Sequence, residues 1–156
     1  PAVEPRIDAQ PLTLFRWWTD GCPHCRASLP ALDRLTRRFQ SRGLQFVAVY
    51  HPKRRVPPTG EALTEYLTHL GVRQAKTARD DQWTKLRDLM SRGQLRRATS
   101  VSFLVDQTGT VRWVHAGPRV HPSTDARHQG PATDYAVLEN LLDALLPRAP
   151  AKRRKR

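Results

Sequence analysis

The sequence predicts an α/β protein in which a mixed central β-sheet is flanked by helices, as a three-layer sandwich. Residues 12–18 and 44–50 are apolar strand patterns, and a long helical pattern separates them. Such a β-α-β unit requires two parallel strands. Residues 101–105 and 110–115 are two further strand patterns around an Asp-Gln-Thr-Gly turn, which predicts an antiparallel hairpin. The two kinds of pairing together predict a mixed sheet covered by helices.

The first strand is expected to lead directly into the first helix. Residues 12–18 should form a buried strand, and residues 19–21 a turn. The helix should begin near Pro23, because proline suits a first-turn position, and stop at Gly43. Pro30 should kink or crowd the helix early, since it lacks the N–H of a helical hydrogen bond. The apolar stripe of this helix consists of Leu29, Leu32, Leu35 and Phe39.

The middle of the chain alternates strands and helices. A valine-rich strand is expected over 44–50, followed by a loop over 51–60 that holds three prolines and three basic residues. A helix over 61–70, a short edge strand within 72–78 and a helix over 82–90 should follow. The inward residues of that last helix are expected to be Trp83, Leu86, Leu89 and Met90.

The C-terminal part holds a long loop and one more helix. Residues 116–131 are expected to be the loop, and residues 133–146 the helix. Residues 1–147 should form a single domain, and residues 148–156 a basic, disordered tail. The apolar face of the last helix should comprise Tyr135, Val137, Leu138, Leu141, Leu142, Leu145 and Leu146.

The chain is strongly basic. Its formal net charge is +13, and removing the six basic residues of 148–156 still leaves +7. Such a charge favours acidic proteins, anionic lipid headgroups or nucleic acid without selecting among them. The sequence contains no recognised nucleic-acid motif, so no specific nucleic acid is expected as a partner. The tail should be solvated, with contact to an anionic surface as the alternative. No apolar run is long enough to span a membrane.

The segment Cys22-Pro23-His24-Cys25 contains the only two cysteines of the chain. Two thiols at this spacing can close a small disulfide ring. Such a ring restrains little of the chain, so it is a poor structural staple but a good redox switch. Cys22 is expected at a helix start, where free backbone N–H groups and the helix dipole favour a thiolate. Cys25 should lie one turn further in, where it is more buried.

Two other readings of the cysteine pair remain open. A purely structural disulfide between Cys22 and Cys25 is one of them. Metal binding by Cys22, His24 and Cys25 together with a distant histidine is the other, although structural zinc sites usually need four ligands. Two further histidines, His121 and His128, flank an aspartate and could form a surface cation site. No metal and no cofactor are expected.

Several segments together resemble the thioredoxin superfamily, and specifically its extracytoplasmic TlpA/ResA-like branch. They are residues 15–25, the later Leu29-Pro30, residues 46–50 and the Phe-Leu-Val-Asp-Gln-Thr-Gly of 103–109. The resemblance covers about residues 10–146. It implies a thioredoxin-like sandwich and a thiol–disulfide oxidoreductase that exchanges disulfides with protein substrates. A redox-recycling partner, a monomeric state and a place in the bacterial periplasm or cell envelope, with a membrane tether in the full-length form, are implied as well.

The chain departs from the usual family pattern at three positions. Arg16 stands six residues before the first cysteine, where thioredoxins often have a buried carboxylate, and Ser28 replaces a glutamate often found in ResA-like proteins. The second departure weakens the case for a role in cytochrome maturation. Ser100 stands where the family usually has a cis-proline, and the Thr99–Ser100 bond is expected to be trans, because a non-proline cis bond costs about 2.5–4 kcal/mol.

The resemblance assigns roles to the residues of the site. Cys22 is expected to be the nucleophile and Cys25 the resolving thiol. Pro23, His24 and Arg16 should tune the thiols: a protonated His24 would add positive charge, and an Arg16 that points at the thiols would favour thiolate. The Pro-His pair also occurs in the oxidising enzyme DsbA, which predicts a redox potential more positive than that of thioredoxin. The substrate-facing residues are expected to be Trp18, Thr99 and Ser100.

Two related functions compete with disulfide exchange. A metal-binding chaperone of the copper type is one, because thioredoxin-like copper chaperones exist. A peroxidase of the peroxiredoxin kind is the other, because Thr19 stands three residues before Cys22, as a threonine does before the peroxidatic cysteine of that family. Arg119 and its neighbours in the long loop are expected to shape the rim of the site.

Overall fold

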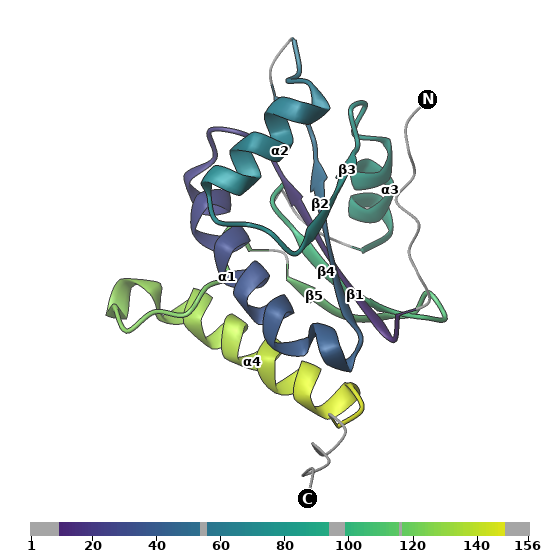
Figure 1. The fold of residues 1–156 in the computed structure, drawn as a ribbon, viewed down its shortest axis with the longest axis vertical. Coiled ribbons are helices and arrows are strands. Elements are labelled where there is room, and N and C mark those ends of the chain that lie inside the picture. Colours follow the sequence, from purple (N-terminus) through teal and green to yellow (C-terminus); the bar gives the residue numbers. More distant parts are fainter. Residues whose placement is uncertain (1–9, 54–55, 94–98, 116, 149–156) are drawn as a thin grey trace, which may run out of the picture.

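A five-stranded mixed sheet with the strand order β3-β2-β1-β4-β5 forms the centre of the molecule (Figure 1). The computed structural model describes residues 10–53, 56–93, 99–115 and 117–148. The predictions for the N-terminal residues 1–9 and for the tail from 149 onward lie outside this description. The mixed sheet and its flanking helices confirm the fold class predicted from the sequence.

The strands lie close to their predicted positions. They are β1 (Leu12–Trp18), β2 (Leu44–Tyr50), β3 (Ala75–Arg79), β4 (Ser102–Asp106) and β5 (Val111–His115). β2 pairs in parallel with both β1 and β3, whereas β4 is antiparallel to both β1 and β5, which confirms the β-α-β unit and the hairpin. β1 is therefore the central strand of the sheet, and its C-terminal end carries the chain into the site.

The edge strand β3 lies within the predicted range 72–78 except for its last residue, Arg79. The backbone N–H groups of Arg73 and Gln74 donate hydrogen bonds to Asp33 Oδ1 at 2.9 and 2.7 Å. Asp33 is a buried residue of the first helix, so these bonds hold the chain against that helix before it reaches β2. A local apolar pattern contains no information about such a contact between distant residues.

Four α-helices accompany the sheet in the described part of the chain: α1 (Pro23–Phe39), α2 (Gly60–His69), α3 (Thr84–Gly93) and α4 (Gln129–Leu145). The predicted start of α1 at Pro23 is confirmed, and α1 continues through Pro30. Gly43, with a φ of 99°, ends the short 3-10 turn that follows α1, as predicted.

Two predicted helix starts were wrong by two or more residues, and α3 also ends three residues later than predicted, at Gly93. α4 begins four residues earlier than expected, because Pro131 lies in its first turn, where no backbone N–H is needed for a helical bond. α3 begins two residues later, because the Asp80 carboxylate accepts hydrogen bonds from the N–H groups of Lys85 and Leu86. Val137, predicted on the apolar face of α4, is instead 49% exposed.

The two faces of the sheet are covered unequally. The larger core cluster contains residues of α1, α2 and α4 together with Leu14 and Trp18 of β1. α1 and α4 lie side by side on this face (Figure 1), and ion pairs from Arg38 and Arg42 of the α1 end to α4 support the contact. The smaller cluster surrounds Trp17 on the opposite face and includes Leu86 of α3. Trp17 and Trp18 thus face opposite ways, as the strand alternation predicts.

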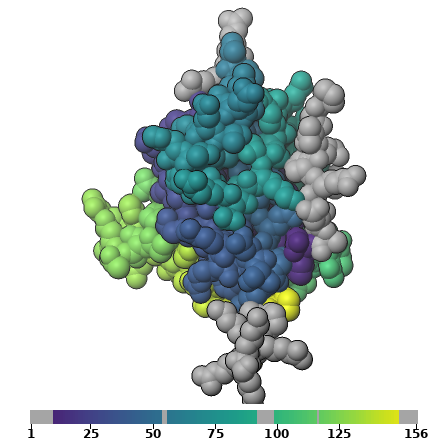
Figure 2. Space-filling view, viewed as in Figure 1, coloured from purple at the N-terminus to yellow at the C-terminus, as the bar shows by residue number. Residues whose placement is uncertain are grey.

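The long connection between β5 and α4 lies at the side of this body. Its part from residue 117 to residue 128, drawn in light green, stands out beside α1 in Figure 2. It ends in a 3-10 turn, Ala126–His128, directly before α4. Over the described residues, none of the helices is both long and apolar enough to cross a membrane.

Candidate active site

The two cysteines lie where the central strand β1 passes into α1. Gly21 makes the turn with a φ of 69°, a backbone conformation that a side chain would disfavour. Cys22 is the N-cap residue of α1, and its Sγ accepts a hydrogen bond from the Cys25 N–H at 3.3 Å. Pro23 follows at the first helical position and is exposed. The local sequence therefore places one sulfur at the positive end of the helix dipole.

The thiols of Cys22 and Cys25 face one another as a free pair. Their sulfur atoms are 2.8 Å apart, with the Cys25 thiol donating to Cys22 Sγ. Cys25 is 1% exposed, whereas Cys22 is only partly buried. The pair is thus close enough to form a disulfide, and only one of its sulfurs is open to solvent.

The surroundings move the two thiol pKa values in opposite directions. Burial by itself would raise the pKa of Cys22, but hydrogen bonds from the Cys25 thiol, the Cys25 N–H and the Ser100 hydroxyl outweigh it and lower that pKa. Burial raises the pKa of Cys25, and the positive charge of Arg16 offsets part of this rise. The thiolate therefore forms first on the more exposed sulfur, as the predicted nucleophile requires.

Arg16 is a fully buried cation beside the thiols. It extends from β1 on the α1 side of the sheet, where its Nη1 donates to Ser102 Oγ at 3.2 Å and its Nη2 to the Pro118 carbonyl at 2.7 Å. Burial lowers its own pKa, and the charges of Cys25 and Cys22 act against that shift. The sequence left the direction of Arg16 open, and this mutual effect places its charge beside both thiols.

Ser100 lies against both sulfurs from the loop before β4. Its Oγ is 3.2 Å from Cys25 Sγ and 3.7 Å from Cys22 Sγ, and the residue is buried. The Thr99–Ser100 bond is trans, since the described residues contain no cis peptide bond, and this confirms the sequence-based expectation. Ser100 thus places a hydroxyl where the resembled family usually has a proline ring.

Trp18 does not belong to a substrate-facing surface, and that prediction was wrong. Its side chain is fully buried in the larger core cluster. Its ring stacks on Tyr66 of α2 at 5.6 Å and meets the edge of Tyr50 at 5.1 Å. Because α2 covers this face of the sheet, the residue that directly precedes the active-site turn points into the core. Thr99, the third residue predicted to face substrate, is partly exposed.

His24 is held as a neutral ring. Arg119 Nε donates to His24 Nδ1 at 2.8 Å, so this ring nitrogen must be an acceptor. Burial, followed by the charges of Arg119 and Arg16, lowers the pKa of His24. The expectation that a protonated His24 adds charge to the site is therefore not met at neutral pH. The charge beside the ring belongs to Arg119, which the sequence had placed only at the rim.

Ser28 has a structural role. Its Oγ donates to the His24 carbonyl at 2.9 Å and accepts from the Val120 N–H at 3.0 Å. The residue is fully buried on α1. It fastens the connection between β5 and α4 to the helix that carries the thiols, a contact between positions 92 residues apart that no sequence spacing predicts.

A shallow cavity opens next to the turn that carries Cys22. Its volume is about 370 Å³, and it lies between the start of α1 and α2. Thr19 lies in the same turn, but it is buried and its hydroxyl contacts Asp20 Oδ1 at 3.5 Å. The residues that line the cavity are Asp20, Gly21, Arg26, Pro58, Ala62, Leu63 and Tyr66.

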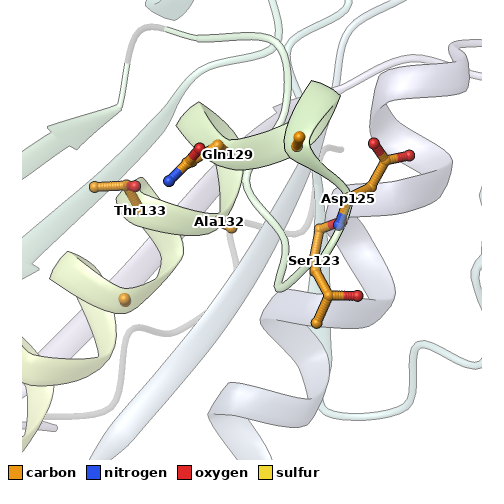
Figure 3. Close-up of a pocket in the computed structure, with 8 residues that line it drawn as sticks. Ser123, Asp125, Gln129, Ala132 and Thr133 are labelled. Atoms are coloured by element: carbon orange, nitrogen blue, oxygen red, sulfur yellow. The ribbon is translucent and has the colours of Figure 1, made fainter.

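The histidines weighed as a surface cation site lie in the β5–α4 connection. The rings of His121 and His128 are 5.1 Å apart, but Asp125 is paired with Arg127. No group of three or more His, Cys, Asp or Glu side chains among the described residues is arranged to hold a metal ion. Figure 3 shows a separate cavity of about 410 Å³ in this region, lined by Ser123, Thr124, Asp125, Ala126, Gln129, Ala132, Thr133 and Ala136.

Comparison with known proteins bears on the fold. No protein-family model matches the chain, and no curated protein sequence matches it either. Among solved structures, a thiol:disulfide interchange protein described as DsbE from Chlorobium tepidum aligns with a TM-score of 0.64 at 23% identity. The alignment covers 88% of this chain and 81% of that protein.

Two further solved structures agree with the first. A secreted disulfide oxidoreductase of Mycobacterium tuberculosis, homologous to E. coli DsbE, has a TM-score of 0.58 at 15% identity, covering 88% of this chain and 84% of its own. StoA from Bacillus subtilis has a TM-score of 0.55 at 15% identity, and the alignment covers 86% of this chain and 84% of StoA. These similarities confirm that the chain has the thioredoxin-like fold predicted from its sequence.

Proposed function

We propose that the protein is a thiol–disulfide oxidoreductase that exchanges disulfides with protein substrates, with Cys22 as the nucleophile and Cys25 as the resolving thiol. One observation carries the proposal: two free sulfurs lie 2.8 Å apart at a helix start, the open one with a lowered pKa and the closed one with a raised pKa. A structural disulfide would not require this asymmetry. Disulfide exchange requires this asymmetry, because one thiol must be open to attack the substrate disulfide and the other must stay protonated until it resolves the mixed disulfide.

The proposed reaction proceeds in two steps. The Cys22 thiolate attacks one sulfur of a substrate disulfide, whose S–S bond breaks and releases the other sulfur as a thiolate. Cys25 then loses its proton and attacks Cys22 Sγ, which expels the second substrate sulfur. The substrate gains two electrons and two protons and leaves as a dithiol, while the protein becomes the Cys22–Cys25 disulfide. Every step is reversible, so the oxidised protein can equally accept electrons from a substrate dithiol.

The buried cation favours the oxidising direction. Arg16 lowers the pKa of Cys25 and so stabilises the reduced form of the pair. A pair whose thiolate is stabilised gives up its electrons less readily. In the disulfide form, Arg16 has no sulfur anion beside it. The potential of the pair is therefore expected to lie above that of thioredoxin. The cavity of about 370 Å³, lined by Gly21 directly before Cys22, offers a place for the polypeptide that carries the substrate sulfur.

We place this activity outside the cytoplasm, in the periplasm or cell envelope. The support is the resemblance to extracytoplasmic proteins together with the fold shared with a secreted Mycobacterium tuberculosis oxidoreductase. A redox-recycling partner, contact of the basic tail with an anionic surface, a monomeric state and attachment to a membrane all remain predictions.

Two measurements test the proposal. The potential of the pair is titrated against glutathione buffers, and it should be more positive than that of thioredoxin. Cys25→Ala is then used to trap mixed disulfides with substrate proteins from an envelope extract, with Cys22→Ala/Cys25→Ala as the matched control. Partners that are released by reductant and absent from the control support the proposal. A pair that neither cycles nor captures anything through Cys22 would overturn it.

A further inference from the structure

Three consecutive residues of the β5–α4 connection, 118–120, are fastened to the redox site at three separate points. The carbonyl of the first accepts a hydrogen bond from Arg16 Nη2 at 2.7 Å, and the N–H of the last donates to Ser28 Oγ at 3.0 Å. The middle residue, Arg119, donates from Nε to His24 Nδ1 at 2.8 Å. Arg16 and Ser28 are two of the residues at which the chain departs from the pattern of the family it resembles. Both departures thus hold this segment in place.

The anchoring fixes the direction of Arg119. Its backbone is held on both sides by the bonds from Arg16 and to Ser28, and its Nη1 lies 2.8 Å from His128 Nε2. An arginine side chain has donors only and keeps its charge, so the ring nitrogens that it meets act as acceptors. A guanidinium with two such partners is held by its fork geometry, whereas a single contact would leave it free to rotate.

We propose that Arg119 is a positioning residue of the thiol pair: it fixes His24 as a neutral ring with its proton on Nε2, and its charge adds to that of Arg16 in stabilising the Cys22 thiolate. This inference rests on the proposed function, since a stabilised thiolate matters only for exchange. It also explains how a Cys-Pro-His-Cys site can be positively charged although its histidine is neutral. The charge resides on the buried Arg16 and on Arg119, which is 95 positions from His24 in the sequence.

The surroundings of His24 support this assignment. The charged groups that act on the His24 ring are Arg119 from the connection and Arg16 from β1. Both arginines oppose a proton on the ring, and so does its burial. An arginine does not titrate between about pH 5 and 8, the range in which a histidine normally would. The thiolate-stabilising charge should therefore stay constant over that range.

Arg119→Met tests the proposal, with Arg127→Met as the matched control. Arg127 belongs to the same connection but is exposed and pairs only with Asp125 among the described residues. Thiolate formation in the isolated reduced protein is followed by ultraviolet absorbance against pH, and the His24 ring by NMR. Arg119→Met should raise the Cys22 pKa by about half a unit to one unit, because removal of a nearby opposite charge disfavours the anion. It should also move the His24 titration up toward the ordinary value of 6.5.

The same variant should change the equilibrium with glutathione. A three- to tenfold shift toward the oxidised protein is expected, which corresponds to a potential lower by about 15–30 mV. Arg127→Met should move none of the three readouts. Equal shifts in both variants would reduce the effect to net surface charge and overturn the proposal. Unchanged titrations in Arg119→Met would overturn it as well.

A second variant keeps the test decisive if Arg119→Met folds poorly. Arg119→Gln retains an N–H donor for His24 Nδ1 but carries no charge, so the same rise in the Cys22 pKa is expected from it. An unaltered Cys22 pKa in Arg119→Gln would overturn the proposal. Because these titrations involve no substrate, they can succeed even if the trapping experiment fails, and the two failures can be told apart.

Discussion

The region around Cys22 and the region around Cys25 meet across 2.8 Å, yet they impose opposite conditions on a thiol. Cys22 lies at the open end of α1 and receives hydrogen bonds that lower its pKa. Cys25 is enclosed by the core, and burial raises its pKa against the pull of a buried arginine. One helical turn thus separates a solvated helix terminus from a low-dielectric interior.

This difference shows how a single turn of helix can assign two roles to two chemically identical groups. The position of Cys22 as N-cap residue follows from the strand–turn–helix junction, so its activation is mainly local, with a further hydrogen bond from Ser100. The state of Cys25 depends first on its burial, then on Arg16 of the preceding strand β1, and on Ser100, which reaches it from a loop 75 residues away. Activation of the first thiol is therefore built mainly by the local sequence, whereas the burial of the second is built by the fold.

The largest expected effect is a contrast in alkylation between the two thiols. In the reduced protein, iodoacetamide should modify Cys22 roughly a hundredfold faster than Cys25, because thiolate fraction falls tenfold for each pH unit below the pKa and burial slows access further. The rate at Cys22 should rise with pH and level off below the ordinary thiol value of 9.0, since its pKa is lowered. Mass spectrometry of the labelled peptides measures both rates. Equal labelling of the two cysteines would contradict the comparison.

A smaller effect is expected from Arg16→Met, which removes the cation beside Cys25. The pKa of Cys25 should rise further, by about one unit, so that it resolves a mixed disulfide about tenfold more slowly near neutral pH. In the disulfide form, Arg16 has no sulfur anion to offset its burial, so the substitution should stabilise the oxidised protein relative to the reduced one. Stopped-flow measurement of resolution and denaturant unfolding of both redox forms test these two expectations.

Arg16→Lys is the matched control for this substitution. It keeps a positive charge but loses the fork that contacts Ser102 and Pro118. Resolution by Cys25 should therefore be slowed less in Arg16→Lys than in Arg16→Met. Equal rates in the two variants would mean that packing, and not charge, connects this residue to Cys25.

The sequence was sufficient for the parts of the site that are local. Cys22 and Cys25 were found from their spacing, and the start of α1 from Pro23, because the strand, turn and helix that hold them are continuous in the chain. The strand pairings were also predictable, since apolar runs and one turn sequence limit the topology of the sheet.

The remaining parts depend on contacts that no spacing encodes. Trp18 points into the core because α2 covers that face of the sheet, and the sequence pattern gives no direction for a strand buried on both faces. His24 is neutral because burial and the charge of Arg119, from a distant loop, lower its pKa. Charge and burial at the site are properties of the assembled fold, so the sequence could name the reacting groups but not their protonation.

The smallest effect is expected from Ser100→Ala, at the point where the two regions meet. The Ser100 hydroxyl lies 3.2 Å from Cys25 Sγ and 3.7 Å from Cys22 Sγ, and its hydrogen bonds lower the pKa of both thiols. Its removal should raise the Cys22 pKa by about half a unit and slow alkylation about threefold below that pKa. Thr99→Ala is the control, because that neighbouring residue has no hydrogen bond to either sulfur among the described residues. If both variants slowed alkylation equally, the hydrogen bonds of Ser100 would not be what lowers the thiol pKa values.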